Sequence, residues 1–268
     1  MNDKLRLMCV LAHPDDESLG TGGILARYAA EGIETYLVTA TRGERGWSGK
    51  PEDYPGLQEL GRIREAELRC AAENLGVREV SFLDYVDGDL DQADPSQVIG
   101  QIAAQLRRVR PHVVVTFGPD GIYGHPDHIA VSQFTTAATV AAADGGYWAG
   151  DLPPHRVSKL YYIAETFDML DIYQASFGDI VMPVDGVDRR AQGWQDWAIT
   201  TRVTAQPHWP MVWRAVRCHS SQVSGYGNLG SLSPDQHERL WGYQTYYRAY
   251  SLINGGRKVE QDLFEGLR

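Results

Sequence analysis

Short apolar segments alternate with segments of helical periodicity through the first 165 residues of the chain. Strands that are buried on both faces and joined by helices form a parallel sheet. The pattern therefore predicts an α/β protein built on a doubly wound, mostly parallel sheet. The predicted strands are Leu5–Ala12, Glu34–Thr41, Glu79–Leu83, His112–Phe117 and Lys159–Glu165, and the predicted helices are Gly22–Ala30, Leu57–Leu75, Pro95–Val109 and Asp127–Ala143.

The alternation weakens in the last third of the chain, which holds five of the seven tryptophans. We expect residues 166–268 to form a smaller α+β cap packed on a core of residues 1–165, the two making one structural domain. The predicted elements of the cap are a strand at Asp179–Val184, helices at Pro207–Cys218 and Pro234–Trp241, and a strand or helix at Tyr243–Leu252.

The composition is ordinary for a soluble globular protein, with 43% hydrophobic and 22% charged residues and a formal net charge of −10. Nucleic-acid-binding proteins carry a basic face. The one basic cluster here, Arg107, Arg108 and Arg110, is typical of a solvated helix end. No apolar stretch approaches the length of a membrane span, and no secretory signal precedes the first strand. We therefore expect a cytoplasmic protein that binds neither nucleic acid nor membranes.

The three cysteines, Cys9, Cys70 and Cys218, are odd in number and lack C-x-x-C spacing. This pattern argues against a disulfide framework and against a thiolate zinc site. We expect Cys218 to be a small core residue.

Two polar motifs follow apolar strands: A-H-P-D-D-E at residues 12–17 and H-P-D-H at residues 125–128. If the two strands end side by side in a parallel sheet, the motifs meet in one crevice. A catalytic zinc site needs three nitrogen or oxygen ligands and one place for water. His13, Asp16 and His128 would supply the three ligands.

The neighbours of these ligands are candidates for acid–base chemistry. Asp15 is adjacent to Asp16, so in a tight turn one can bind metal while the other faces the water. Zinc lowers the pKa of bound water to about 7, and Asp15 would accept the proton as the carbonyl is attacked. A protonated His125 would stabilise the oxyanion, and Asp15 and His125 are both candidates for protonating the leaving amine. Asp127 would hydrogen-bond an imidazole and tune its basicity.

Other classes of protein fit the sequence less well. G-T-G-G at residues 20–23 is only a partial phosphate loop, and the carboxylates before it disfavour a pyrophosphate. No G-x-S-x-G occurs, and Cys218 and His219 would point apart on a helix. A non-catalytic sugar-binding protein that retains a metal site is a further alternative, although binding alone needs neither Asp15 nor His125.

The order and context of the motifs resemble the LmbE-like (PIG-L) family of zinc-dependent N-acetylglucosaminyl deacetylases, whose fold is Rossmann-like. The resemblance implies a hydrolase of carbon–nitrogen amide bonds that acts on a small amino-sugar substrate. It implies one Zn²⁺ per chain, with Fe²⁺ or Co²⁺ as other metals. The matching elements, over most of residues 5–165, are A-H-P-D-D-E at 12–17, T-R-G-E at 41–44, R-E-A-E-L at 64–68, L-G at 75–76, Leu83 to Asp87-Gly88, and H-P-D-H at 125–128, with H-S-S-Q at 219–222 as a looser one.

By this resemblance, Asp15 is the general base, His125 is the acid that stabilises the oxyanion, and the zinc ligands are His13, Asp16 and His128. The resemblance also implies that the sugar contacts Arg64, Asp87 and Glu44, and that Tyr123 touches the reacting carbonyl.

These residues also have ordinary interpretations. Arg64 would then pair with Glu67 or Glu44 on a solvated face, and Asp87 would be a turn residue before Gly88. Outside the matching core, we expect Glu17 to be a helix-start carboxylate, and we favour a helix C-terminal cap over a substrate contact for His219.

The last third of the chain leaves the substrate open. Bacterial members of the family deacetylate N-acetylglucosamine linked to inositol, malate or another sugar, and one branch cleaves mycothiol conjugates. An amidase of a thiol-sugar conjugate is therefore an alternative. The last third of the chain, which helps to choose among these branches, matches none of them clearly, and its insertion-like stretch Arg189–Pro210 is what leaves the substrate undecided. Members of the family form dimers to hexamers, so a homo-oligomer is also open.

Overall fold

The computed structural model describes residues 4–268, apart from residues 179–180, 185, 228 and 257. Its main sheet contains β1 (Arg6–Leu11), β2 (Glu34–Thr41), β3 (Glu79–Tyr85), β4 (Val113–Phe117), β5 (Lys159–Ile163), β8 (Thr201–Thr204) and β9 (Tyr243–Ser251). The strand order is β3-β2-β1-β4-β5-β9-β8. The first five strands run parallel, and β9 is antiparallel to both of its neighbours. A separate hairpin pairs β6 (Val181–Val184) with β7 (Val187–Arg190).

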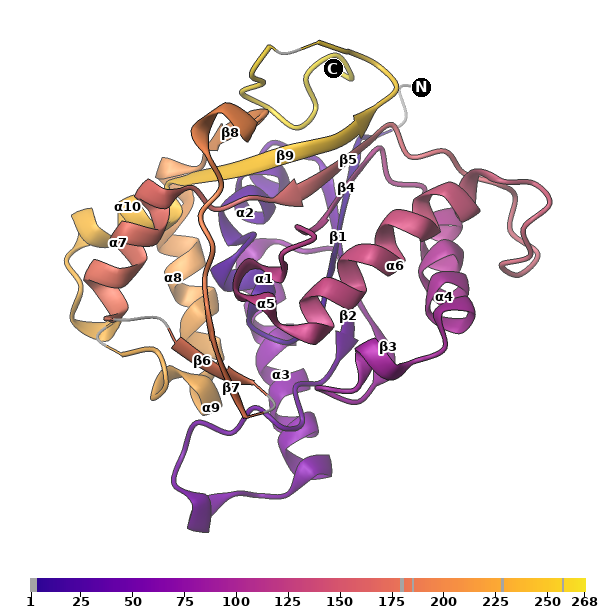
Figure 1. Cartoon of the computed structure of the whole chain (residues 1–268). Coiled ribbons are helices and arrows are strands. Elements are labelled where there is room, and N and C mark those ends of the chain that lie inside the picture. Colours follow the sequence, from indigo (N-terminus) through magenta and orange to yellow (C-terminus); the bar gives the residue numbers. More distant parts are fainter. Residues whose placement is uncertain (1–3, 179–180, 185, 228, 257) are drawn as a thin grey trace.

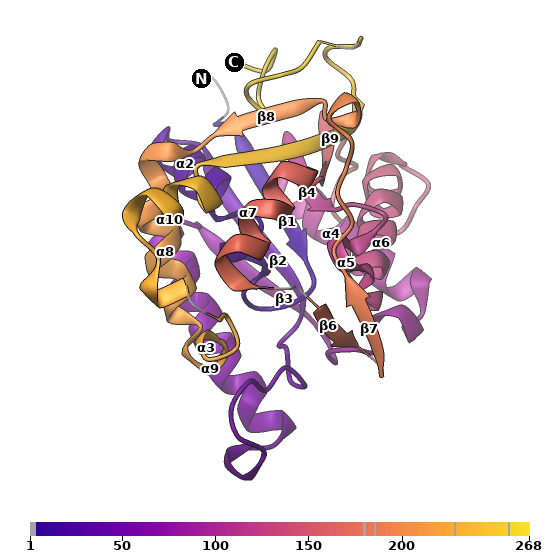
Figure 2. The same cartoon turned by 60° about the vertical axis from the view of Figure 1, so that its left-hand side comes forward.

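Helices cover both faces of the sheet (Figures 1 and 2). On one face, α2 (Gly22–Ala30) and α3 (Leu57–Leu75) pack with α8 (Trp209–Cys218), and on the other α4 (Pro95–Val109) packs with α6 (Pro126–Ala143). The predicted α/β class with a doubly wound, mostly parallel sheet is therefore confirmed. None of the described helices is long and apolar enough to cross a membrane. The other described helices are α1 (Asp16–Leu19), α5 (Gly121–Gly124), α7 (Phe167–Phe177), α9 (Ser220–Val223), α10 (Pro234–Trp241), η1 (Pro51–Asp53), η2 (Leu90–Gln92), η3 (Asp196–Ala198), η4 (Gln206–His208) and η5 (Leu229–Ser231).

The order of the strands reverses between β1 and β4. The chain passes outward from β1 to β2 and β3, and then returns to place β4 on the other side of β1, with Leu7 opposite Val113 and Cys9 opposite Val115. At such a switch point the connections diverge and leave a crevice at the carboxyl ends of the strands. The segments that carry the two polar motifs follow β1 and β4, so they meet at this crevice.

The last third of the chain contributes strands to the same sheet. β9 pairs with β5, where Ile163 lies opposite Tyr246, and β8 forms the edge. The segment Tyr243–Leu252, for which the sequence allows strand or helix, is the strand β9. The predicted strand Asp179–Val184 corresponds to β6, with residues 179 and 180 outside the described residues, and α7, β7 and β8 have no counterpart among the predictions.

A disulfide joins Cys70 in α3 to Cys218 at the end of α8. The expectation drawn from the cysteine pattern is therefore wrong for this pair, and Cys218 is not an ordinary core residue. The odd count arises because Cys9 is buried alone in β1. The pairing of Cys70 with Cys218 cannot be read from the cysteine spacing, because the two positions are 148 apart in sequence and only the packing of α3 on α8 brings them together.

The basic cluster at the end of α4 is only partly a solvated helix end. Arg107 is 3% exposed, and its guanidinium donates to the carbonyl oxygens of Ala142, Asp144 and Tyr147. These carbonyls lie at and just beyond the end of α6, so Arg107 fastens α4 to α6. These hydrogen bonds bury the Arg107 guanidinium between α4 and α6, where it cannot contact a nucleic acid.

Candidate metal centre and active site

In the turn after β1, the side chains of Asp15 and Asp16 point in different directions. Asp15 has φ 104° and ψ −28°, in the left-handed region that residues other than glycine rarely adopt. Asp16 folds back, and its Oδ2 accepts the backbone N–H groups of Ala12 (3.2 Å) and His13 (2.8 Å). Asp15 instead faces Arg64 on α3. The strained turn therefore separates one carboxylate from the other.

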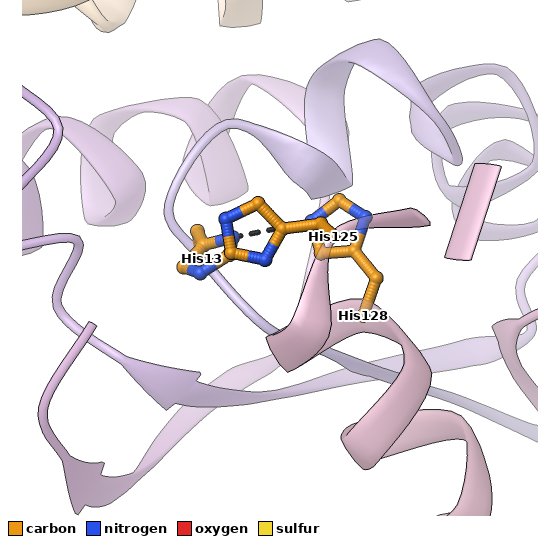
Figure 3. Close-up of side chains that lie close together, drawn as sticks. All are labelled: His13, His125 and His128. Carbon is orange, nitrogen blue, oxygen red and sulfur yellow. Dashed lines mark hydrogen bonds between the residues drawn. The ribbon is translucent and has the colours of Figure 1, made fainter. Parts of the chain in front are cut away.

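Side chains of the two motifs gather around one point. His13 Nδ1 lies 3.2 Å from His128 Nε2. Asp16 Oδ2 lies 3.7 Å from His13 Nδ1, and Asp16 Oδ1 lies 3.5 Å from His128 Nε2. Tetrahedral zinc ligands with bonds of about 2.0–2.2 Å lie roughly 3.3–3.6 Å from one another. His125 lies beside these two imidazoles (Figure 3), with one ring nitrogen of each of the three within 4.8 Å of the others. The spacing of the donor atoms fits a single divalent cation.

The partners of the second nitrogen in each ring, His13 Nε2 and His128 Nδ1, explain why His13 Nδ1 and His128 Nε2 face each other. His13 Nε2 lies 3.1 Å from the carboxylates of both Asp87 and Asp127, so the proton of a neutral ring belongs on Nε2. His128 Nδ1 lies 3.3 Å from the carbonyl oxygen of Gly121, so its proton belongs on Nδ1. Both facing nitrogens then present lone pairs. Two lone pairs this close repel each other unless a proton or a metal ion lies between them.

Burial and neighbouring charges shift the pKa values of Asp16 and His13. Burial raises the pKa of Asp16 to about 7, with the charge of His13 opposing the rise and Asp15 and Glu17 adding to it. Burial disfavours charge on His13 too, but the carboxylates of Asp87, Asp127 and Asp16 outweigh it and set the pKa of His13 well above its usual value. A bound cation would take the place of these protons, because it favours the carboxylate and the neutral imidazole.

His125 occupies the N-cap of α6. Its Nδ1 accepts the backbone N–H of Asp127 at 3.1 Å, which requires an unprotonated Nδ1 and places the N–H of the neutral ring on Nε2. Tyr123 lies edge-on to His125 and His128, with ring centroids 5.9 and 5.3 Å away. Ile122 has φ 65°, so this loop is strained where it places the tyrosine beside the imidazoles.

Asp15 is held by one oxygen only. Arg64 Nη2 donates to Oδ2 at 3.1 Å, and the hydroxyl of Tyr226 donates to the same oxygen at 2.7 Å. Among the residues that the structure describes, none hydrogen-bonds Oδ1. One oxygen of Asp15 is therefore left to accept a proton in the crevice.

Comparisons with known proteins show which family the chain belongs to. The family model PIG-L, described as GlcNAc-PI de-N-acetylase, matches residues 8–139. A protein of Thermobispora bispora named 1D-myo-inositol 2-acetamido-2-deoxy-alpha-D-glucopyranoside deacetylase is 32% identical over 98% of both chains. The chain belongs to the PIG-L family. A protein of the same name from Thermobifida fusca is 38% identical over 87% of this chain and 88% of its own. The crystal structure of a conserved protein from Thermus thermophilus, 28% identical, has a TM-score of 0.66 over 94% of this chain and 97% of its own.

The residues that the PIG-L resemblance assigns to the sugar lie around the same crevice. Arg64 is 3% exposed and donates to the carbonyl oxygens of Gly43 and Pro14, so its interpretation as a residue of a solvated face is wrong. A side chain at Gly43 would collide with this guanidinium, which explains the glycine of T-R-G-E. Glu44 Oε2 accepts the backbone N–H of Asp87 at 3.1 Å. Contact of Arg64, Asp87, Glu44 and Tyr123 with a sugar stays a prediction.

Two buried residues support the turn and were not predicted to do so. Glu17 lies in the first turn of α1, as expected, but it is 0% exposed and accepts the backbone N–H of Asp15 at 2.9 Å. Its other oxygen lies 2.7 Å from His219 Nε2. His219 follows α8 as its C-cap residue, as expected. The Glu17–His219 pair therefore stabilises the turn that contains Asp15 and Asp16, although His219 lies some 200 residues away in sequence.

The H-S-S-Q motif is the signal that could have pointed to this interaction. Glu67 on α3 accepts hydrogen bonds from the side chains of Ser220 and Ser221 and from the backbone N–H of Ser221. Gln222 Nε2 donates to the carbonyl oxygen of Gly46 at 2.6 Å. Every residue of the motif thus joins the last third of the chain to the walls of the crevice.

Proposed function

We propose that this PIG-L protein is a metal-dependent hydrolase that removes the acetyl group from an N-acetylglucosaminyl substrate. The observation that carries the proposal is the pair of ring nitrogens, His13 Nδ1 and His128 Nε2, that face each other at 3.2 Å beside Asp16. Asp15, the neighbour of Asp16 in the chain, is bonded through Oδ2 by Arg64 and Tyr226, and among the described residues nothing hydrogen-bonds its other oxygen. A purely structural metal site would use a fourth protein ligand and would need no such base.

The metal would be held by His13, Asp16 and His128, with Zn²⁺ as the favoured ion and Fe²⁺ or Co²⁺ as substitutes. When bound, a divalent cation supplies activation of water and polarisation of a carbonyl oxygen. Asp127 and Asp87 then keep the proton of His13 on Nε2, so that Nδ1 stays a ligand.

The protein's own groups would move the protons. Asp15 Oδ1 accepts a proton from the attacking water, while Arg64 holds the other oxygen in place. His125 donates a hydrogen bond from Nε2–H to the developing oxyanion and keeps its proton, and the cap bond at Nδ1 fixes that tautomer. Protonated Asp15 then returns the proton to the leaving amine. The neutral His125 ring suffices for this role and replaces the imidazolium expected from sequence.

The proposed substrate is N-acetylglucosamine linked to inositol. The support for inositol is the name shared by the Thermobispora and Thermobifida relatives, each of which this chain matches over most of its length. Arg64, Asp87, Glu44 and Tyr123 would contact the sugar. No described residue favours the alternative, an amidase of mycothiol-type conjugates, but the experiment below includes it.

The test is a panel of N-acetylated compounds given to metal-stripped protein and to protein reloaded with Zn²⁺: N-acetylglucosaminyl-inositol, N-acetylglucosaminyl-malate, diacetylchitobiose and a mycothiol conjugate. We expect equal amounts of free amine and acetate from the inositol compound, only after metal is restored. Amine without acetate from the mycothiol conjugate would indicate the amidase. No amine from any compound with Zn²⁺, Fe²⁺ or Co²⁺ would contradict the proposal and favour a sugar-binding protein.

Two variants test the assigned roles. Asp15→Asn should keep its metal and lose about 10²- to 10⁴-fold in kcat, because it removes the base and no ligand. His128→Ala should lose metal, whereas His208→Ala, in η4 away from the crevice, should keep both metal and activity. Near-normal kcat in Asp15→Asn, or an unchanged metal content in His128→Ala, would show the corresponding assignment to be wrong.

A further inference from the structure

The segment 219–226 is fastened to the crevice along its length. His219 pairs with Glu17, and Ser221 is held by Glu67 on α3. Ser48, in the loop after β2, donates to the carbonyl oxygen of Ser221 at 2.6 Å. The segment therefore connects α1, α3 and that loop, and the residue at its far end has a fixed place.

That residue is Tyr226, which no sequence motif singles out. Its ring is half-buried against the apolar core. Its hydroxyl donates to Asp15 Oδ2 at 2.7 Å, the oxygen that Arg64 also contacts. Burial and the negative charge of Asp15 raise the pKa of Tyr226 well above its usual value, so the phenol stays a neutral donor.

Two hydrogen-bond donors on Asp15 Oδ2 fix the orientation of the carboxylate, which a single donor cannot do. Arg64 alone would let the Asp15 carboxylate turn about its Cβ–Cγ bond and exchange its two oxygens. The phenol approaches Oδ2 from the last third of the chain, whereas the guanidinium approaches from α3. Together they fix which oxygen is bound and which is open, and a fixed acceptor is what a general base needs.

We propose that Tyr226 is a positioning residue for Asp15, which holds Oδ2 so that Oδ1 faces the attacking water. The inference rests on the proposed function, because it assigns Asp15 the role of base. It differs from the role of Tyr123, whose ring lies against the imidazoles of His125 and His128. It also makes the last third of the chain part of the catalytic arrangement and not only a cap.

The first test is Tyr226→Phe, which removes the hydroxyl and keeps the ring. We expect kcat for the inositol substrate to fall roughly 10- to 100-fold, the effect of losing one hydrogen bond to a charged group, with KM and metal content unchanged. The matched control is Tyr162→Phe, which removes a hydroxyl that bonds Thr136 on α6 at 2.9 Å, and it should retain full kcat. Unchanged kcat in Tyr226→Phe would overturn the inference. So would a change confined to KM, which would indicate a sugar contact, or a fall in Tm far beyond that of the control.

The second test is the double variant with Asp15→Asn. If Tyr226 acts through Asp15, adding Tyr226→Phe to Asp15→Asn should change kcat less than about two-fold. Independent, multiplying losses would overturn the inference while leaving the proposed function intact. Wild-type protein that releases no amine from any substrate would instead overturn the proposed function, and the inference with it.

Discussion

At the scale of single residues, the arrangement around His13 depends on a carboxylate that is fully buried. Asp127 is 0% exposed, and Oδ2 accepts the backbone N–H of Gly88 at 2.7 Å while facing His13 Nε2 at 3.1 Å. Its Oδ1 accepts the backbone N–H of Leu90 at 3.1 Å. Three N–H groups therefore converge on two oxygens, and the carboxylate satisfies all of them.

Asp127→Asn should weaken metal binding by about 10- to 100-fold, the usual cost of changing a group that orients a ligand. The amide has one acceptor oxygen, so its NH₂ must face either His13 or the backbone N–H of Leu90. The measurement is metal affinity by chelator competition. Asp91→Asn, in the exposed turn η2 nearby, is the control. Equal affinities in the two variants would show that Asp127 does not orient His13.

Sequence reasoning could predict best the residues that come directly after strands or begin the next helix. His13, Asp16 and His128 follow neighbouring strands or begin the next helix, so the topology of the sheet alone brings them together. Asp87 was expected at the sugar, but its contact with His13 depends on how the loop after β3 folds. Tyr226 and the pair Glu17–His219 depend on where the last third of the chain packs, and no periodicity encodes that.

At the scale of elements, the disulfide between α3 and α8 is the covalent link of the first helical layer to the last third of the chain. Removing it with Cys70→Ser and Cys218→Ser together should lower the free energy of unfolding by about 2–4 kcal/mol, because it frees a 148-residue loop in the unfolded chain. For a protein of this size that is a fall in Tm of roughly 4–7 °C.

The control for this prediction is reduction of both proteins with dithiothreitol. Reduction should lower the Tm of the wild-type protein to that of the double variant, and it should leave the Tm of the double variant unchanged. Because Cys218 directly precedes His219, kcat should fall with reduction as well. An equal Tm for wild-type and double-variant protein under oxidising conditions would mean that the bond does not form in solution.

Elements were predictable where capping residues marked their ends. Helix α3 ends before Gly76, whose φ of 73° only glycine adopts readily, and α4 begins at Pro95 after the capping residue Asp94. Helix α7 escaped prediction although the Thr166 side chain caps it, because no clear apolar stripe follows. The strand β8 is four residues long at the sheet edge, too short for an alternating pattern to stand out.

At the scale of the whole molecule, the end of the chain is fastened to the sheet by one buried carboxylate. Glu260 is 1% exposed and ion-paired with Lys159 on β5 (2.7 Å) and Arg248 on β9 (3.0 Å). It also accepts the hydroxyl groups of Tyr161 at 2.6 Å and Thr201 at 3.1 Å. One side chain thus joins β5, β8, β9 and the last residues, which lie together in Figure 1.

Glu260→Gln should lower the free energy of unfolding at pH 7 by about 3–5 kcal/mol, because it leaves the buried Lys159 without its counter-charge. The pH dependence follows from the pKa of Glu260. Burial would raise that pKa, but the bonds from Lys159, Tyr161 and Asn254 outweigh it and lower the pKa below its usual value. Its stabilisation is therefore present above the unfolded-state pKa of about 4.3 and is lost as the pH falls through the folded-state pKa. Urea unfolding at pH 3–7 should show the wild-type advantage over Glu260→Gln shrinking only in acid. The exposed Glu52→Gln in η1 is the control, and a constant advantage at every pH would show that the charge of Glu260 is not what holds the tail.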